Sequence, residues 1–200
     1  MASHRLLTPA DHRRTPWKNG GGRTTEIAAG PPDAGFADFA WRVSVADIEH
    51  DGAFSVFPGV VRTLVLLAGG GVRLTGAGAP LELRAPFEPV TFAGDAPLMC
   101  ALVDGPVRDF NLMVRRDVHR GEVIVVREGA QALGPAGVYL CYAARGGCEC
   151  LISGHPPIAL AEEHALLVEN DQAEVASGAG MQVNPGSATA VAIVAVIASA

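Results

Sequence analysis

The chain has 200 residues and a formal net charge of -6 at pH 7, from 15 Lys and Arg against 21 Asp and Glu. This length fits one domain or two small lobes. Because nucleic-acid binding relies on clustered positive charge, a pI of about 5.4 argues against DNA or RNA as the primary ligand. With 49% hydrophobic and 18% charged residues, the chain has enough apolar side chains to bury a full core.

The 24 glycines and 14 prolines fall at short intervals between β-branched runs, a pattern typical of an all-β sandwich or barrel. Helix is expected only in short pieces, at Pro9–Arg14 and Ala159–His164. So many short strands indicate two packed barrels or a double sandwich, with a seam near Arg116–Gly121. The predicted strands are Thr24–Ala28, Phe39–Ile48, Thr63–Ala68, Gly71–Thr75, Leu81–Arg84, Val90–Phe92, Leu98–Val103, Phe110–Arg115, Glu122–Arg127, Val138–Ala143, Cys148–Ser153, Ala165–Val168, Ala173–Ser177 and Ala190–Ile197.

We therefore expect an N-terminal barrel at residues 1–116 and a C-terminal barrel at residues 117–200. The first half is richer in aromatic residues, Arg and Asn, and is expected to hold the ligand pocket, whereas the second is expected to be a scaffold or a homodimer surface. The apolar run Ala188–Ala200 has 13 residues, too few to cross a bilayer as a helix. No secretory signal can be read at the N-terminus, so a cytoplasmic location is expected.

The most informative segment places Trp17, Lys18 and Asn19 directly before three consecutive glycines. Glycine lets the backbone approach a ligand closely, while the other three side chains supply an apolar wall, a cation and a two-way hydrogen-bonding group. A flexible connector is the alternative, but a connector rarely needs Trp. The segment therefore predicts part of a binding site.

Two arginines stand on predicted strands. Alternation puts Arg42 on the opposite face from Trp41, where it either lines a cavity or is solvated with its stem packed. Arg62 stands at the mouth of a strand that is apolar on both faces, where its guanidinium is expensive to desolvate unless a carboxylate satisfies it. That carboxylate is either internal, from Glu26 or Asp109, or belongs to a ligand, and the residues alone do not decide between them.

Asp109, Asn111 and Met113 share one face of a strand whose other face is apolar. This combination suits the wall of a mixed polar and apolar pocket. The alternative is an exposed edge strand, although Met113 is a poor choice for contact with water.

Three blocks carry a resemblance to a known family: PWKNGGGRTTEIA at Pro16–Ala28, FAWRVSVADIEHDGAFSVFPGVVRTLVLLAGGG at Phe39–Gly71 and FAGDAPLMCALVDGPVRDFNLMVRR at Phe92–Arg116. They are similar to the HutD/Ves family of bacterial proteins. The resemblance implies an all-β, two-lobed cupin-like β-barrel (a double-stranded β-helix, or bicupin) with a cytosolic role linked to histidine utilisation. It further implies a ligand-binding regulator that takes a small pathway acid, urocanate or formylglutamate, and restrains induction rather than catalysing a step.

Carried onto this chain, the family motifs imply ligand-binding residues and no catalytic residue or cofactor. Arg62 suits a carboxylate, since guanidinium and carboxylate pair through two parallel hydrogen bonds. Trp17 or Phe57 would stack a flat group such as an imidazole. The motif residues are Trp17, Lys18, Asn19, Glu26, Arg42, Phe57, Arg62, Asp109, Asn111 and Met113.

Metal chemistry has weak support in the sequence. Catalytic cupins hold a metal with a His-x-His pair, which this chain lacks, and the strand near Arg62 carries only that arginine, so no metal is predicted in the first barrel. In the second half, a hairpin turning at Arg145-Gly146 would bring Cys141, Cys148 and Cys150 together. His155 would complete a zinc ligand set, but Cys-x-Cys on a strand more often packs as small apolar residues.

Two other functions stay open. Glu26, Asp109 and His50 are candidates for metal-independent acid–base catalysis, as in a cupin-type isomerase or lyase acting on a small acid or a sugar-like substrate. A protein partner would instead require a contiguous apolar surface patch. Acyl transfer has no support, because the chain has no Gly-x-Ser-x-Gly motif.

Overall fold

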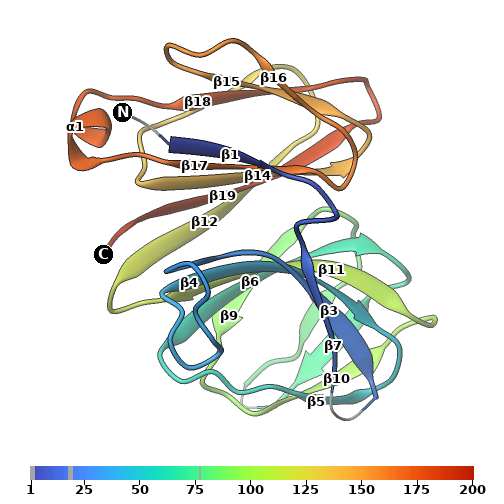
Figure 1. Ribbon diagram of the computed structural model, residues 1–200. Helices are drawn as coiled ribbons and strands as arrows, with labels where there is room; N and C mark the ends of the chain where they lie inside the picture. The colour runs from blue at the N-terminus through green and yellow to red at the C-terminus, as the bar shows by residue number, and fades with distance from the viewer. Residues whose placement is uncertain (1–2, 18–19, 77) are drawn as a thin grey trace. The chain divides into compact units, whose positions relative to one another are not determined.

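The computed structural model describes residues 3–17, 20–76 and 78–200, which form two compact units (Figure 1). One unit is Arg13–Arg120 with Ala200, and the other combines the N-terminal residues through His12 with Gly121–Ser199. Both units are built almost wholly of antiparallel strands, so the predicted all-β class is confirmed. The Arg13–Arg120 unit is described first, because it contains most of the predicted site residues.

Two antiparallel sheets form the Arg13–Arg120 unit. Apolar side chains of both sheets, among them Leu64, Leu66, Leu74 and Leu98, pack into one core. The six-stranded sheet has the order β2 (Arg13–Pro16), β3 (Gly22–Gly30), β4 (Trp41–Ile48), β11 (Val107–Arg115), β6 (Val60–Ala68) and β9 (Pro89–Ala93). The four-stranded sheet has the order β5 (Gly52–Phe54), β10 (Leu98–Leu102), β7 (Val72–Thr75) and β8 (Leu81–Leu83).

The central strands of the six-stranded sheet place polar side chains on its inner face. β11 lies between β4 and β6, and its register puts Asn111 opposite Ser44 on one side and Leu64 on the other. A register shift between Arg108 and Asp109 interrupts the pairing with β6. Such bulges redirect side chains, and this one directly precedes a buried aspartate.

The second unit is also a pair of packed sheets. Its core joins side chains from both sheets, including Tyr139, Leu166, Ile152 and Val183. The five-stranded sheet has the order β1 (Ser3–Leu7), β17 (Ala165–Glu169), β14 (Val138–Arg145), β19 (Val191–Ser199) and β12 (His119–Val126). The four-stranded sheet has the order β13 (Gln131–Leu133), β18 (Met181–Pro185), β15 (Cys148–Ile152) and β16 (Ile158–Leu160).

The helix predictions are wrong. The described residues contain one helix, α1 (Gln172–Ala176), where a strand was expected. Its Asp171 forms a capping box with Glu174, a short-range signal that the alternation of apolar residues does not contain. Of the expected helices, Pro9–Arg14 is a turn leading into β2, and Ala159–His164 is the end of β16 and a turn. Among the described residues, no helix is long and apolar enough to cross a membrane.

The N-terminal segment does not belong to the first unit, as a division at residue 116 would have it. β1 pairs along its whole length with β17, from Ser3 opposite Glu169 to Leu7 opposite Ala165. Leu7 is buried, so this pairing adds an apolar side chain as well as backbone hydrogen bonds. The first strand of the chain thus belongs to the sheet of the C-terminal unit.

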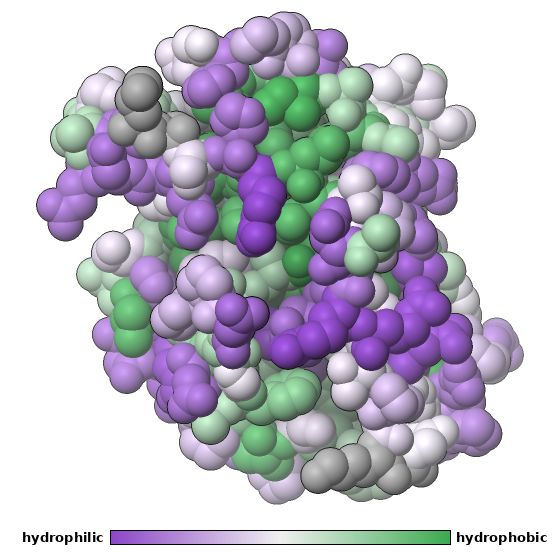
Figure 2. All heavy atoms as spheres, viewed as in Figure 1, coloured by the Kyte–Doolittle hydropathy of each residue, from purple (hydrophilic) through white to green (hydrophobic). Residues whose placement is uncertain are grey.

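Apolar side chains gather on one face of the unit that contains β15 and β18 (Figure 2). An open depression of about 420 Å³ lies on this unit, with Leu133, Ile152 and Met181 in its lining. Its one titratable group among the described lining residues is His155, whose ring packs against His4 with centroids 4.6 Å apart. The polar side chains of its described lining, Ser153, His155 and Gln182, include no charged carboxylate, arginine or lysine.

Candidate functional site

A cavity of about 580 Å³ lies inside the Arg13–Arg120 unit. This volume is typical of sites for small molecules. Charged, polar and aromatic side chains from β2 to β6 and from β11 line it together. Of the predicted site residues, the lining includes Trp17, Arg42, Phe57, Arg62, Asp109, Asn111 and Met113.

Arg62 is buried in this cavity among aromatic rings. Its guanidinium carbon lies 4.5 Å from the ring centroid of Phe54, 5.4 Å from that of Phe92 and 5.6 Å from that of Phe57. Cation–π attraction to these rings therefore stabilises the buried positive charge of Arg62. Within the described part of the chain its one hydrogen bond is a long one of 3.4 Å from Nη1 to the Ser55 carbonyl, and its Nε has no partner. Burial lowers the pKa of Arg62 to about 10, so the group stays cationic at neutral pH.

Asp109 is a buried carboxyl on the same cavity wall. Its Oδ1 has no hydrogen-bond partner. Burial raises the pKa of Asp109 to about 7, against the lowering effect of Arg62. Arg62 and Asp109 interact through their charges but make no hydrogen bond or ion pair with each other, so neither of the predicted internal partners contacts Arg62 directly.

Strand alternation brings a second polar pair to this wall. Asn111 on β11 and Ser44 on β4 are both buried, and neither Asn111 Oδ1 nor Ser44 Oγ has a partner. Met113 is also buried, packed with Phe39 and Val60. Since β11 is a central strand, the edge-strand alternative for Asp109, Asn111 and Met113 is wrong.

Glu26 pairs with other arginines instead of Arg62. One of its carboxylate oxygens accepts a hydrogen bond from Arg42 Nε at 2.6 Å, and the other accepts one from Arg13 Nη2 at 2.8 Å. A register shift between Glu26 and Ala28 lies next to it in the pairing of β3 with β4. Arg42 also stacks on Phe36, with its guanidinium carbon 4.6 Å from the ring centroid. Glu26 therefore fixes Arg42 and is absent from the cavity lining.

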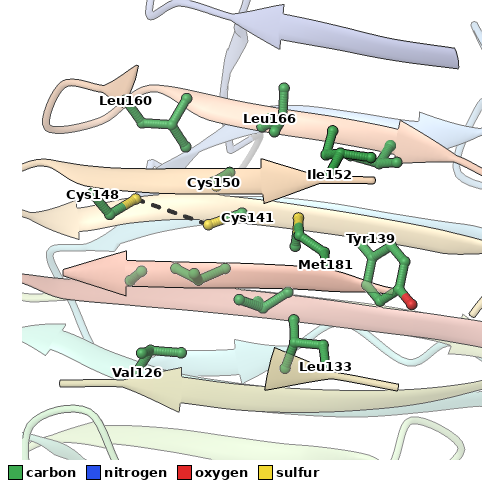
Figure 3. Close-up of a cluster of buried hydrophobic side chains, with 14 of the residues drawn as sticks. Val126, Leu133, Tyr139, Cys141, Cys148, Cys150, Ile152, Leu160, Leu166 and Met181 are labelled. Carbon is green, nitrogen blue, oxygen red and sulfur yellow. Dashed lines mark hydrogen bonds between the residues drawn. The ribbon is translucent and has the colours of Figure 1, made fainter. Parts of the chain in front are cut away.

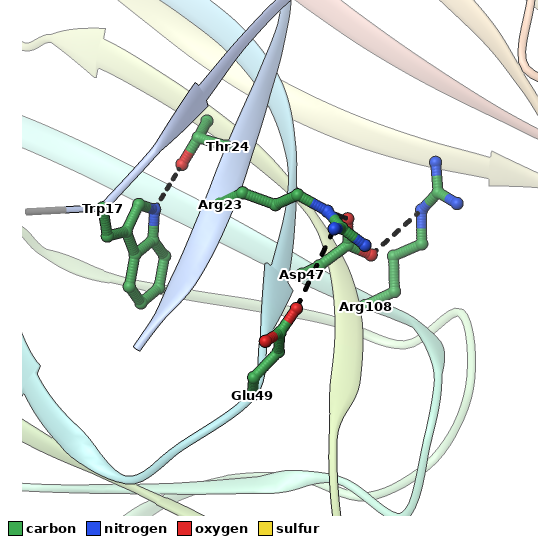
Figure 4. Close-up of polar contacts among 6 residues, drawn as sticks. All are labelled: Trp17, Arg23, Thr24, Asp47, Glu49 and Arg108. Carbon is green, nitrogen blue, oxygen red and sulfur yellow. Dashed lines mark hydrogen bonds and ion pairs between the residues drawn. The ribbon is translucent and has the colours of Figure 1, made fainter. Parts of the chain in front are cut away.

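The β2–β3 hairpin contributes Trp17 to the cavity. Its indole Nε1 donates a hydrogen bond of 2.8 Å to Thr24 Oγ1, which fixes the plane of the ring (Figure 4). Arg23, the residue before Thr24 on β3, donates a hydrogen bond of 2.9 Å from its Nε to Asp47 Oδ2. Lys18 and Asn19, which were predicted as ligand-binding residues, lie outside the described residues.

The cavity does not have the side chains of a metal site. Its described lining contains no His, Cys or Glu, and Arg62 places a positive charge beside the one carboxyl, Asp109. The divalent ions of cupin enzymes need several anionic or imidazole ligands, so this donor set does not fit them. The acid–base set of Glu26, Asp109 and His50 is not assembled either, because only Asp109 lines the cavity and His50 is exposed.

Cys141, Cys148 and Cys150 do converge, for a different reason than predicted. Their sulfur atoms lie within 4.8 Å of one another, with 4.0 Å between the first two (Figure 3). β14 and β15 do not pair with each other but belong to the two facing sheets, so the thiols meet across the core. Hydrogen bonding with its two neighbours, together with burial, raises the pKa of Cys141. His155 is not in this group, so a four-ligand zinc site is not formed.

The residue analysis missed several lining side chains. Ser44 could have been found, since it shares with Arg42 the strand face that was already considered. Phe54 comes from the short strand β5 and Phe36 from a loop, and Phe92 of β9 contacts Arg62 without being part of the lining. No spacing rule brings these aromatic residues to Arg62, because their approach depends on how the two sheets close.

The sequence profile of the HutD family matches residues 9–184. A Pseudomonas putida protein described as an uncharacterized 21.2 kDa protein in the hutC 3′ region is 36% identical over 154 residues, which cover 77% of this chain and 80% of that protein. Protein Ves of Citrobacter koseri is 38% identical over 148 residues, 72% of each chain. The match to the family extends through most of both units.

Solved structures of similar proteins superimpose on nearly the whole of this chain. A conserved protein of unknown function from Pseudomonas aeruginosa PAO1 superimposes with a TM-score of 0.88 at 34% identity, over 98% of this chain and 100% of that one. HutD from Pseudomonas fluorescens SBW25 gives 0.80 at 28% identity, over 99% and 100%. An oxalate decarboxylase from Lactobacillus farciminis gives 0.65 at 8% identity, over 96% and 85%, and shows the cupin-like fold alone.

Proposed function

Because this chain belongs to the HutD family, whose members stand in the context of histidine utilisation, we propose that it is a non-catalytic regulator that binds a small carboxylate through Arg62. The proposed ligands are urocanate and formylglutamate. HutD from P. fluorescens was solved in a formate condition, and formate is the smallest carboxylate.

The observation that carries the proposal is the set of unpartnered polar atoms around one cavity. Arg62 Nε, Asp109 Oδ1, Asn111 Oδ1 and Ser44 Oγ are all buried without a hydrogen bond. Leaving buried polar groups unpaired is costly, and they occur at sites that bind polar ligands. A carboxylate is the natural acceptor for Arg62, since charge-assisted guanidinium bonds are strong and directional.

The aromatic rings that line the cavity support a flat or compact ligand. Trp17 and Phe57 line the cavity, and Trp17 is oriented by its hydrogen bond to Thr24. Such rings offer faces for stacking a planar group of the ligand. A regulator needs only ligand-dependent stability or shape, and among the described lining residues Asp109 is the one carboxyl.

A thermal-shift titration with urocanate and formylglutamate tests this function. We expect each true ligand to raise the melting temperature of the wild type, since binding to the folded state alone stabilises it. Arg62→Ala should abolish the shift. Arg73→Ala is the matched control, because Arg73 is half-exposed in the same unit and pairs with Glu82 on the surface.

Chromatography of the same mixtures separates a binder from an enzyme. Unchanged ligand after prolonged incubation is expected. Consumption of ligand would favour the isomerase or lyase alternative, for which Asp109, with its pKa raised to about 7, is the candidate acid or base among the described lining residues. A shift that survives in Arg62→Ala would contradict the assigned role of Arg62.

A further inference from the structure

Two groups of opposite charge share the cavity without direct contact. Arg62 on β6 and Asp109 on β11 are both buried, and they are connected by no hydrogen bond or ion pair. Arg62 Nε and Asp109 Oδ1 are each left without a partner. The other cation of the wall is Arg42, whose Nε donates a hydrogen bond of 2.6 Å to Glu26 Oε2 and not to Asp109.

Opposite charges this deeply buried normally pair directly, because each is costly to desolvate alone. Here the aromatic rings of Phe54, Phe57 and Phe92 hold the Arg62 guanidinium by cation–π contacts, and Asp109 stands on the neighbouring strand. A ligand that satisfies both groups needs an acceptor for Arg62 and a donor for Asp109. Asn111 Oδ1 and Ser44 Oγ add further acceptors without partners.

We infer that the cavity selects carboxylates that also carry an N–H donor, with Arg62 receiving the carboxylate and Asp109 receiving the N–H group. The inference rests on the proposed function and deepens it: Asp109 becomes the residue that determines specificity within the class of small acids. A simple carboxylate fills only the Arg62 half of the site and leaves the Asp109 carboxyl unsatisfied.

The charged surroundings of Asp109 make this selection depend on pH. Arg62 faces it from β6, Asp47 acts on it from β4, and the Cys100 thiol on β10 lies within its electrostatic reach. Arg42 on β4 acts on Arg62. Burial holds the pKa of Asp109 near 7, so above this pH an ionised Asp109 repels a bare carboxylate and accepts a stronger hydrogen bond from an N–H donor.

A matched ligand pair tests the inference by calorimetry. Urocanate and 3-(2-furyl)acrylate have nearly the same shape and the same carboxylate, but the furan ring has no N–H. Because an unsatisfied buried acceptor weakens binding, we expect the wild type to bind urocanate roughly tenfold or more tightly than furylacrylate. Asp109→Leu, which removes the acceptor, should bring this ratio close to one. Asp104→Asn, an exposed control outside the cavity, should leave the ratio unchanged.

A second measurement does not depend on the variant folding. For the wild type, the affinity ratio should rise between pH 6.5 and pH 8.5 as Asp109 ionises. Equal binding of the two ligands by the wild type, or a ratio that Asp109→Leu leaves unchanged, would overturn the inference and leave the proposed function standing. Failure of urocanate, furylacrylate and formylglutamate alike to bind would overturn the proposed function itself.

Discussion

At Asp109, burial works against the stability of the unliganded protein. The pKa of this carboxyl is raised to about 7 by burial, from an ordinary value of 3.8. Between these pH values the folded protein binds more protons than the unfolded chain, so the contribution of Asp109 to stability falls as the pH rises. Above pH 7 the penalty is complete and amounts to roughly 4 kcal/mol.

Asp109→Asn should therefore stabilise the unliganded protein, and more so at high pH. From the same linkage, the penalty that the variant removes is about 2 kcal/mol at pH 5 and roughly 4 kcal/mol at pH 8. Urea denaturation of both proteins at the two pH values measures this difference. A variant whose advantage over the wild type is the same at pH 5 and pH 8 would mean that Asp109 titrates alike in the folded and unfolded states.

The residue scale also shows what sequence reasoning could reach. That Arg62 needs a partner follows from its place on an apolar strand, and that Asp109, Asn111 and Met113 share a wall follows from alternation. The pairing of Glu26 with Arg42 does not follow, because a register shift in β3 intervenes after Glu26. The aromatic enclosure of Arg62 depends on packing between sheets, which no local pattern contains.

Among the elements, β3 and β4 are joined by an ion pair that positions the cavity wall. The Arg42 side chain is 7% exposed and the Glu26 side chain 15% exposed, and Arg42 Nε lies 2.6 Å from Glu26 Oε2. Removing one partner of a buried pair leaves the other charge uncompensated. Glu26 therefore acts on the site through Arg42, as a positioning residue.

Glu26→Gln should lower the free energy of unfolding by about 1–3 kcal/mol, as for a buried group that loses a charged hydrogen-bond partner. Guanidinium denaturation at pH 7 measures it. The matched control is Arg116→Gln, which breaks an exposed pair with Asp95 and should change stability far less. Similar losses in the two variants would show that the Glu26–Arg42 pair behaves like a surface salt bridge.

Sequence reasoning misassigned one helix and one hairpin, each for its own physical reason. α1 depends on a capping box at Asp171 and Glu174, and its apolar residues are too few to show a helical period. β14 and β15 looked like a hairpin because a Gly-Gly turn joins them, yet they run into opposite sheets. Local turns do not reveal whether a chain stays in one sheet or crosses to the next.

At the scale of the whole molecule, the all-β class and the presence of two strand-rich units could be predicted from turn spacing alone. The order of the sheets could not, since β1 finds its partner β17 from the far end of the sequence. Such pairings depend on contacts between residues distant in the chain. The family comparison extends through both units, and residues 9–184 match its profile.

The most direct test of the central claim, that Arg62 receives a carboxylate, is the side-chain Nε–Hε resonance of Arg62 in a 15N–1H NMR spectrum. This N–H has no partner in the unliganded protein, so a carboxylate that binds it should shift the resonance strongly downfield on titration with urocanate or formylglutamate. Chloride at equal ionic strength should not reproduce the shift. An Arg62 resonance that stays in place while either ligand binds would contradict the account.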